Sequence, residues 1–462
     1  MSQSPTSSSS NSKEQARDAA GYIETRVEAE RALLAQLILD EPAKTVAAPE
    51  GSGEDYESRL DELAGLAEAA GAIVVGHVTQ RRARPAPATL FGKGKVAELA
   101  ERCQAEKIDV VIVDCDLSPA QGRNLENELK VRVIDRTELI LDIFARRAQT
   151  RQAKLQVELA QLQYQLPRLK RMWTHLSRIG GGIGLRGPGE TQLETDRRLA
   201  LGRMSTLKEQ LADIRRQKKV ESAGRLDFES GALVGYTNVG KSALLNALSS
   251  PTGQHVLVAN QLFATLGATT RKFELGGGRT VLLSDTVGFV RRLPHHLVES
   301  FHSTLAEVQD ADFLLLVADA ADPELDDKLE SVQKVLREIE VIETPTLLVL
   351  NQCDRVDAAE RAALLRQHPD AVLTSALTGE GLDELKNRIR KTLEQGDEEV
   401  DLMLDAQAAQ TGKLLAEIAR HGRVLEQDWS GDGAQPQVHV RARLSRRWRE
   451  KLGMPRKQGA AA

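Results

Sequence analysis

Short apolar runs alternate with helix-type patterns in the first third of the chain. Between Arg31 and Arg146 the runs ALLAQLIL, AIVVGHV, VVIVD and VRVID are separated by segments in which apolar residues recur at helical spacing, most clearly over residues 56–70 and 95–106. Apolar runs of this length are typical of strands that are buried on both faces. Their alternation with helices predicts a small parallel sheet covered by helices.

A different period follows between Arg146 and Val220. Apolar residues recur there at spacings of 3 and 4 on two segments, which are separated by the break GGGIGLRGPGE. The first seam consists of Leu155, Leu159, Leu162, Leu166, Leu169, Trp173 and Leu176, and the second of Met204, Leu207, Leu211 and Ile214. Two helices can bury such seams against each other, so the pattern predicts an antiparallel helical hairpin with a glycine-rich tip.

Strands and helices alternate again from Phe228 to Leu393. The apolar runs are ALVGYT, TVLLSDTVG, FLLLVADA, TLLVLNQCD and AVLTSAL, and a closing helix follows them. This order predicts a doubly wound α/β sheet. Beyond it, a strand at VDLML, a helix over residues 412–421 and a strand at VHVRARL predict a small α+β domain with a basic end.

These patterns divide the chain into five parts. We predict a disordered polar tail (1–20), an N-terminal α/β domain (21–145), a basic helical hairpin (146–225), a doubly wound domain (226–397) and a C-terminal α+β domain (398–462). The tail, which includes four consecutive serines, buries too little apolar area to offset the entropy lost on ordering.

Composition narrows the class of protein. Of the 462 residues, 41% are hydrophobic and 28% charged, as in folded globular proteins. No apolar run approaches the roughly 18 residues that a membrane span needs, and the N-terminus lacks the parts of a secretory signal. Cys103, Cys115 and Cys353 have no metal-type spacing, which argues against a disulfide framework or a zinc site. We therefore expect a cytoplasmic monomer without a membrane span.

One segment of the doubly wound part carries a phosphate-binding pattern. Residues 235–242, GYTNVGKS, match G-x-x-x-x-G-K-[ST] between a predicted strand and a predicted helix. Glycines let backbone N–H groups converge on phosphate oxygens, Lys241 reaches the outer phosphates, and Ser242 offers its hydroxyl to Mg²⁺. An ordinary glycine-rich turn is the alternative, which these flanks disfavour. The predicted phosphate loop of this P-loop NTPase fold consists of Gly235, Tyr236, Thr237, Asn238, Val239, Gly240, Lys241 and Ser242.

Further polar residues follow later strands in the order that a GTP site requires. Asp285, Thr286, Val287 and Gly288 come after the apolar TVLLS, so Asp285 is placed for a water-mediated contact with Mg²⁺ and the Gly288 amide for the γ-phosphate. Residues Asn351, Gln352, Cys353 and Asp354 follow TLLVL, and Ser375, Ala376 and Leu377 follow AVLT.

The last two groups resemble the guanine-reading elements of GTPases. Asp354 would accept hydrogen bonds from the guanine N1–H and its exocyclic amine, and Asn351 would brace the loop. A buried Asp facing adenine would be unpaired, which favours GTP over ATP. Taken alone, Asn-x-x-Asp is more typical of a capped turn, and it is the order of these groups at successive strand ends that favours a GTP site.

Longer strings carry a more specific resemblance. They are KLQVELAQLQYQLPRL, GGIGLRGPGETQLETDRR, QLFATLGATTRK and DTVGFVRRLPHHLVESFHSTLAE. Together they resemble the HflX family of ribosome-associated GTPases over roughly residues 25–450. The resemblance implies an N-terminal HflX domain, a helical hairpin, a G domain and a small C-terminal domain. It also implies GTP-dependent binding to the large ribosomal subunit and, in some members, separation of stalled ribosomes.

The resemblance also assigns switch I to Phe263, Ala264, Thr265, Leu266 and Gly267. The Thr265 hydroxyl would close on Mg²⁺ when the γ-phosphate is present, with Thr269 and Thr270 as alternatives. The implied Mg²⁺ contacts are Ser242, Thr265 and, through water, Asp285. The residues expected to act directly in hydrolysis are Lys241, Thr265 and Gly288.

Three positions bear on how this member works. The family usually has Asp-Pro where this chain has Gly267-Ala268, and usually has lysine where it has Gln352, so a looser switch I and weaker guanine binding are expected. Phe289 takes the place of the glutamine that orients water in Ras-like enzymes, a feature that this family shares. We therefore expect slow unaided hydrolysis that a partner accelerates. Arg291 and Arg292 are either guanidinium donors or partner-facing cations.

Excess positive charge is concentrated in two segments. The chain as a whole carries −5, but residues 146–219 hold 17 Lys or Arg against 6 Asp or Glu, and residues 441–462 hold 8 against 1. Local charge of this kind is typical of phosphate-backbone contacts, although a solvated helical face has the same composition. With the family resemblance, it predicts rRNA contacts at Arg178, Arg186, Arg197 and Arg198.

Several alternatives stay open at this point. The protein could be an assembly GTPase that acts on immature large subunits, or an RNA-binding module in which GTP is only structural. The segment FGKGKV, residues 91–96, lacks the Walker spacing and is either a strand-to-helix turn or a second contact for ATP or RNA phosphate.

Overall fold

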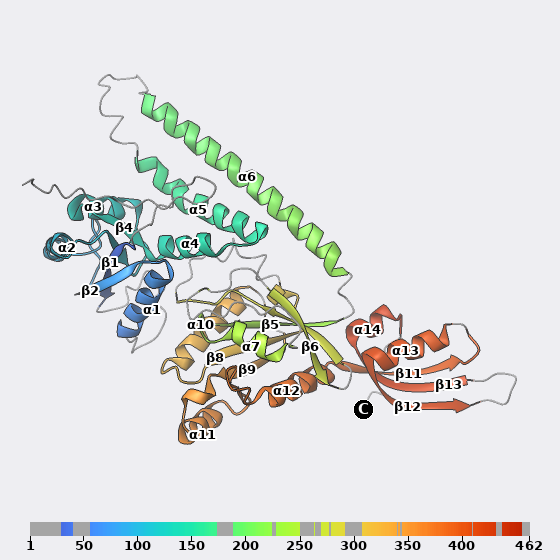
Figure 1. Cartoon of the computed structure of the whole chain (residues 1–462). Helices are drawn as coiled ribbons and strands as arrows, with labels where there is room; N and C mark the ends of the chain where they lie inside the picture. The colour runs from blue at the N-terminus through green and yellow to red at the C-terminus, as the bar shows by residue number, and fades with distance from the viewer. Residues whose placement is uncertain are drawn as a thin grey trace, which may run out of the picture.

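Three sheets and one pair of long helices make up the computed structural model (Figure 1). It describes residues 29–39, 56–172, 188–223, 228–249, 263, 269–276, 279–291, 307–339, 341, 344–408, 410–430 and 437–454. The six-stranded sheet lies in the middle of the molecule, between the four-stranded sheet and the three-stranded one (Figure 1).

The N-terminal sheet is parallel throughout, as the alternation of strands and helices predicts. Its strands are β1 (Arg31–Leu39), β2 (Ile73–Arg82), β3 (Val110–Val113) and β4 (Arg132–Asp135), in the order β2-β1-β3-β4. Its helices are α1 (Tyr56–Ala69), α2 (Lys93–Ala105), α3 (Pro119–Leu129) and α4 (Arg136–Arg147). One core cluster includes buried residues of α1 and α4, and a second includes buried residues of α2 and α3, so both faces of the sheet are covered.

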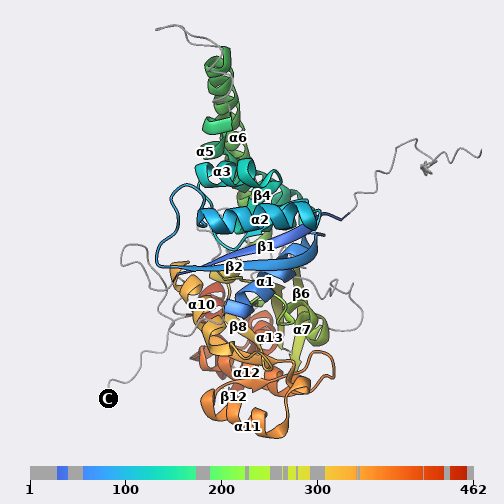
Figure 2. The ribbon, with the colours of Figure 1, turned by 90° about the vertical axis from the view of Figure 1, so that its left-hand side faces the viewer.

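Two long helices follow, α5 (Arg151–Met172) and α6 (Pro188–Ala223). They run in opposite directions side by side and project away from the sheets (Figures 1 and 2). Their contact is a small apolar cluster of Leu155, Leu159, Leu207 and Leu211, with Leu162, Met204 and Ile214 packed against it. Arg203 of α6 also forms an ion pair with Glu158 of α5 at 2.6 Å. Among the described helices, none is both long and apolar enough to cross a membrane.

The central sheet has the order β10-β9-β8-β5-β7-β6. Its strands are β5 (Glu229–Gly235), β6 (Thr269–Gly276), β7 (Arg279–Asp285), β8 (Phe313–Asp319), β9 (Thr346–Asn351) and β10 (Val372–Leu373). Its helices are α7 (Lys241–Leu248), α10 (Leu325–Glu338), α11 (Ala358–Gln367) and α12 (Leu382–Gln395). All pairs are parallel except β6 with β7. The sheet is therefore mixed, with β6 as an antiparallel edge strand that the apolar runs do not predict.

The C-terminal sheet is antiparallel, in the order β11-β13-β12. Its elements are β11 (Asp397–Asp405), α13 (Thr411–His421), β12 (Gly422–Ser430), β13 (Gln437–Ser445) and α14 (Arg446–Lys451). One face of β13 enters the core through Val438, Val440, Ala442 and Leu444, against Ile418 of α13. Arg279 of β7 joins this part to the central sheet, because it pairs with both Glu229 and Asp397.

Candidate nucleotide site

The phosphate loop connects β5 to α7. Two of its glycines have positive φ, +154° at Gly235 and +87° at Gly240. A β-carbon at Gly235 would lie 2.1 Å from the carbonyl oxygen of Val317, and one at Gly240 would lie 2.4 Å from Nδ2 of Asn351. Any larger residue would therefore clash at both positions, so the loop can pass this close to β8 and β9 only with glycine.

Lys241 begins α7 and turns its side chain back across the loop. Its Nζ donates to the carbonyl oxygens of Gly235 at 3.1 Å and Tyr236 at 2.6 Å, and the side chain is buried. Burial lowers the pKa of Lys241 to about 8, although the nearby Asp285 carboxylate raises it. A phosphate group placed in the loop would favour the charged ammonium.

Ser242 and Asp285 meet beside the loop. The Ser242 hydroxyl donates to Oδ2 of Asp285 at 2.5 Å, and Asp285 is fully buried at the end of β7. A hydroxyl and a carboxylate oxygen this close are hard oxygen donors of the type that Mg²⁺ prefers. The residues present therefore fit a magnesium ion. The next residue, Thr286, is committed to the sheet, because its hydroxyl donates to the carbonyl oxygen of Leu233 at 2.6 Å.

The segment after Thr286 lies directly against the phosphate loop. The N–H of Thr237 donates to the carbonyl oxygen of Phe289 at 2.8 Å, and the N–H of Phe289 donates to that of Gly235 at 3.0 Å. Gly288 sits between these bonds, where it borders Thr237 and the Lys241 ammonium. The Phe289 ring is buried in the core of the central sheet, so it offers no polar group to a water molecule.

The two segments predicted to read the base join the phosphate loop through Asn351. Its Nδ2 donates to the carbonyl oxygen of Val239 at 2.9 Å, and its Oδ1 accepts the N–H of Ala376 at 3.1 Å. Asn351 therefore ties three loops together. Asp354 lies on the short 3₁₀ helix of residues 353–355 and is exposed. In the last loop Ser375 is buried and Leu377 is 88% exposed.

The Gln352 side chain connects two parts of the same region. It adopts a left-handed conformation with φ of +62°, and its Nε2 donates to the carbonyl oxygen of Asn238 at 3.3 Å. Its Oε1 accepts from Arg355 Nη1 at 2.7 Å. The amide thus bridges the phosphate loop and the 3₁₀ helix at the position where the family usually has lysine.

The other predicted residues divide into described and undescribed ones. Ala264, Thr265, Leu266, Gly267, Arg178 and Arg186 lie outside the described residues. Of the alternatives to Thr265, Thr270 shares a hydrogen bond with the Ser284 hydroxyl at 2.8 Å within the sheet, and Thr269 is opposite Asp285 in the register. Arg197 and Arg198 are exposed on α6.

The sequence did not predict a contact between the N-terminal domain and the phosphate loop. The Tyr236 hydroxyl donates to Oε2 of Glu62, from α1, at 2.5 Å and accepts the N–H of Arg291. Burial and the Glu62 carboxylate raise the pKa of Tyr236, which keeps the hydroxyl protonated. Arg136 pairs with Glu62 and, at 2.9 Å, with Asp114, and also donates to the carbonyl oxygen of Arg291 at 3.2 Å.

Residues next to the two segments predicted to contact the γ-phosphate also pack against the N-terminal domain. Phe263 is buried, and its ring meets that of Phe144 edge-to-face at a centroid distance of 4.6 Å. Val290 belongs to the same apolar cluster. The Arg291 guanidinium is paired with Glu324 at 2.7 Å, and its side chain is largely shielded from solvent.

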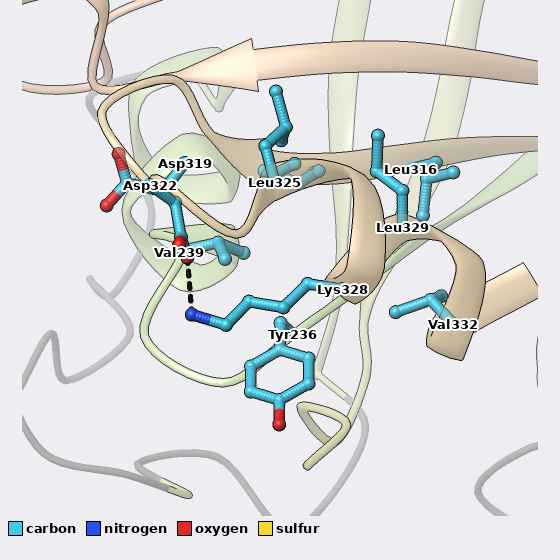
Figure 3. Close-up of a pocket in the computed structure, with 11 residues that line it drawn as sticks. Tyr236, Val239, Leu316, Asp319, Asp322, Leu325, Lys328, Leu329 and Val332 are labelled. Carbon is cyan, nitrogen blue, oxygen red and sulfur yellow. Dashed lines mark hydrogen bonds and ion pairs between the residues drawn. The ribbon is translucent and has the colours of Figure 1, made fainter. Parts of the chain in front are cut away.

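A small pocket lies behind the phosphate loop, between Tyr236, Val239 and α10 (Figure 3). The Lys328 side chain extends across it to Asp322, with Nζ 2.6 Å from Oδ2, and its ammonium lies 5.4 Å from the centroid of the Tyr236 ring. The pocket is otherwise lined mainly by apolar residues of β8 and α10. It is part of the support of the loop rather than the nucleotide site.

Nucleotide affinity should fall as the pH rises through the pKa of Lys241. Below pH 8 the ammonium is charged in both the free and the bound protein, whereas above it the free protein must take up a proton on binding. We expect GTP affinity to drop about tenfold between pH 7 and pH 9. Isothermal titration calorimetry in buffers of different ionisation enthalpy measures both the affinity and the proton uptake. Constant affinity without proton uptake would contradict this assignment.

The fold and site together define a class of protein. A doubly wound sheet carries the phosphate loop after β5, the magnesium-type carboxylate after β7 and the guanine-type Asn351–Asp354 segment after β9. These are the parts of a P-loop GTPase G domain. The particular family follows from comparison with known proteins: the chain belongs to the HflX GTPase family.

Three family models match successive parts of the chain. They are described as GTP-binding GTPase N-terminal over residues 57–145, GTP-binding GTPase Middle Region over 147–225 and 50S ribosome-binding GTPase over 230–352. GTPase HflX of Lacrimispora saccharolytica is 43% identical over 410 residues, which cover 88% of this chain and 95% of that one. GTPase HflX of Escherichia coli is 42% identical over 391 residues, covering 83% and 89%. The resemblance noted from the sequence is thereby confirmed.

Among solved structures, a crystal structure of SsGBP in complex with GDP is similar to this chain. It is 26% identical, with a TM-score of 0.45, over 79% of this chain and 99% of that one.

Proposed function

We propose that this protein hydrolyses GTP in the cytoplasm and uses the third phosphate of GTP to control its docking on the large ribosomal subunit, where it splits or rescues stalled ribosomes. The assignment of a GTP site is supported by the convergence of Lys241, the Ser242–Asp285 pair and Asn351 at one edge of the central sheet. Membership in the HflX family, with a domain described as a 50S ribosome-binding GTPase, supports the ribosomal target.

The residues of the chain divide the work on GTP. Backbone N–H groups of the phosphate loop and the Lys241 ammonium hold the β- and γ-phosphates, while Asp354 reads the guanine edge. When bound at Ser242 and Asp285, Mg²⁺ supplies charge that neutralises the phosphates. The Gly288 amide and the Thr265 hydroxyl respond to the γ-phosphate, and so distinguish GTP from GDP.

Hydrolysis by the isolated protein should be slow. The Phe289 ring is buried and has no polar atom, and the Arg291 guanidinium is held by Glu324. In the part of the chain that the structure describes, neither a glutamine nor an arginine is placed to stabilise the transition state as in Ras-like enzymes. A ribosomal partner would therefore accelerate the reaction by repositioning the two switches.

The contacts of the N-terminal domain give a route from the nucleotide to the helical hairpin. Phe263 and Val290, which flank the γ-phosphate elements, belong to the same apolar cluster as Phe144 and as Val157 of α5. A displacement of either switch would therefore change the packing at the start of α5. The exposed Arg197 and Arg198 of α6 would then meet rRNA phosphates in a nucleotide-dependent way.

Sedimentation with purified large subunits tests this proposal. The full chain should pellet with them in a non-hydrolysable GTP analogue and stay in the supernatant in GDP, and subunits should raise GTP turnover. Reversing charge at Arg178, Arg186, Arg197 and Arg198 to glutamate should weaken binding and flatten its salt dependence. A matched control reverses four exposed cations of the G domain, namely Lys334, Arg337, Arg366 and Lys391.

The outcomes separate the candidate functions. Equal binding in GDP and the analogue, or fast turnover that subunits leave unchanged, would refute the nucleotide switch. Absence of turnover under all conditions would favour an RNA-binding module with structural GTP. Conversion of intact ribosomes to subunits in sucrose gradients supports splitting, whereas association with immature particles supports an assembly role.

A further inference from the structure

The phosphate loop contains a buried hydroxyl without a hydrogen-bond partner. Thr237 is only 6% exposed, and its Oγ1 is buried with no partner in the described part of the chain. Its N–H, by contrast, is engaged with the carbonyl oxygen of Phe289 at 2.8 Å. Because buried hydroxyls are almost always hydrogen-bonded in folded proteins, an isolated one in a ligand site indicates a partner that arrives with the ligand.

The neighbouring polar side chains already have partners. Lys241 Nζ donates to two carbonyl oxygens of the phosphate loop, and the Ser242 hydroxyl donates to Asp285. The Thr286 hydroxyl donates to a carbonyl oxygen of β5. The Thr237 hydroxyl, by contrast, can engage a ligand without displacing an existing hydrogen bond of the described structure.

Thr237 borders the γ-phosphate end of the site rather than the base end. A β-carbon built on Gly288 would lie 2.6 Å from Cγ2 of Thr237 and 3.0 Å from Nζ of Lys241. The methyl group and backbone of Thr237 therefore pack directly against Gly288, and the Lys241 ammonium lies beside them. Asn351, which belongs to the base-reading side, contacts the loop at Val239 instead.

We propose that the Thr237 hydroxyl orients the water molecule that attacks the γ-phosphate of GTP. The inference rests on the proposed GTP hydrolysis and assigns to Thr237 the task that the buried Phe289 cannot perform. The water oxygen forms a bond to the γ-phosphorus as the bond to the bridging oxygen breaks, and that electron pair leaves with GDP. Thr237 Oγ1 accepts a hydrogen bond from the water and so fixes the direction of attack.

The proton of the attacking water goes to a γ-phosphate oxygen. A neutral hydroxyl is too weak a base to keep it, so Thr237 positions the water without being protonated. Phosphoryl transfer depends mainly on positioning and charge stabilisation, which makes a single well-placed hydroxyl sufficient for a slow basal rate. Inorganic phosphate and GDP are then the balanced products of GTP and water.

Thr237→Val removes the hydroxyl and keeps the shape. With the full chain, we expect its affinity for a non-hydrolysable GTP analogue to stay within about twofold of the unchanged protein, while single-turnover hydrolysis slows about tenfold or more. Thr237→Ser keeps the hydroxyl and should retain most of the rate. Thr346→Val, which removes a hydroxyl at the exposed start of β9, is the matched control and should leave the rate unchanged.

Stability supplies a second readout. Because Oγ1 is unpaired in the described structure, Thr237→Val should unfold at the same temperature as the unchanged protein or higher. If Thr237→Val hydrolyses GTP at the original rate, or if Val and Ser slow it equally, the inference is overturned while GTP hydrolysis stands. If the unchanged protein hydrolyses no GTP with or without large subunits, both the inference and the proposed enzymatic function fail.

Discussion

Replacing Lys241 with alanine should lower the affinity for GTP and GDP about a thousandfold, which corresponds to about 4 kcal/mol. The ammonium is buried and points into the loop, where its two present partners are backbone carbonyl oxygens of Gly235 and Tyr236. Without it, the phosphates would face these carbonyl dipoles with no compensating cation. Isothermal titration calorimetry with each nucleotide measures the effect.

The control for this variant is another lysine of the G domain. Lys334→Ala removes an exposed ammonium from α10, away from the phosphate loop, and should leave both affinities unchanged. Circular dichroism should show that Lys241→Ala is folded, because burial lowers the pKa of this lysine and its charge costs stability in the free protein. A folded Lys241→Ala variant that binds GTP with unchanged affinity would show that Lys241 does not hold the nucleotide phosphates.

The phosphate loop and the polar residues at strand ends could be predicted because local sequence patterns determine their positions. A glycine-rich string between a strand and a helix fixes where Lys241 and Ser242 lie, because both follow from backbone geometry within eight residues. Asp285 and Asn351 could be placed near the loop because parallel strands end at the same edge of a sheet. The structure brings Asn351 to within 2.9 Å of the Val239 carbonyl oxygen in this way.

Contacts between distant segments could not be predicted. Tyr236 and Glu62 are separated by 174 positions, and nothing in a single sequence shows which carboxylate faces a given tyrosine. The same holds for the rings of Phe144 and Phe263, which meet only after two domains pack together. Tyr236 within the phosphate loop was a weak signal, since aromatic residues are often partly buried against a neighbouring element.

Weakly patterned strands were missed for a different reason. Nearly every residue of β12 is exposed, so its sequence, GRVLEQDWS, has no apolar alternation to indicate a strand. Backbone pairing with β13 defines it instead. At β6, antiparallel pairing at the edge of the sheet tolerates the polar residues of TTRKFELG.

Asp354→Asn should reverse the choice of base. The Asp354 carboxylate would accept hydrogen bonds from two guanine donors, N1–H and the exocyclic amine. An asparagine amide can accept only one of them, because its NH₂ group would face the other donor without forming a hydrogen bond. Xanthine has a carbonyl oxygen in place of the amine and pairs with the amide. We expect GTP affinity to fall about a hundredfold and xanthosine triphosphate affinity to rise by a similar factor, because a site built for one hydrogen-bond pattern strongly rejects the other. Competition binding with a fluorescent guanine nucleotide measures both changes.

The fold should tolerate this exchange, since the Asp354 side chain is exposed. The buried residue of the 3₁₀ helix is its neighbour Cys353. Asp370→Asn, at another exposed carboxylate of the G domain, is the matched control and should keep the preference for GTP. Because Gln352 bridges the phosphate loop and Arg355, it supports the position of the helix but faces no base donor in this assignment. Gln352→Lys should therefore change guanine and xanthine affinities together, whereas Asp354→Asn changes them in opposite directions. A variant at Asp354 that still prefers GTP would show that the base is read elsewhere.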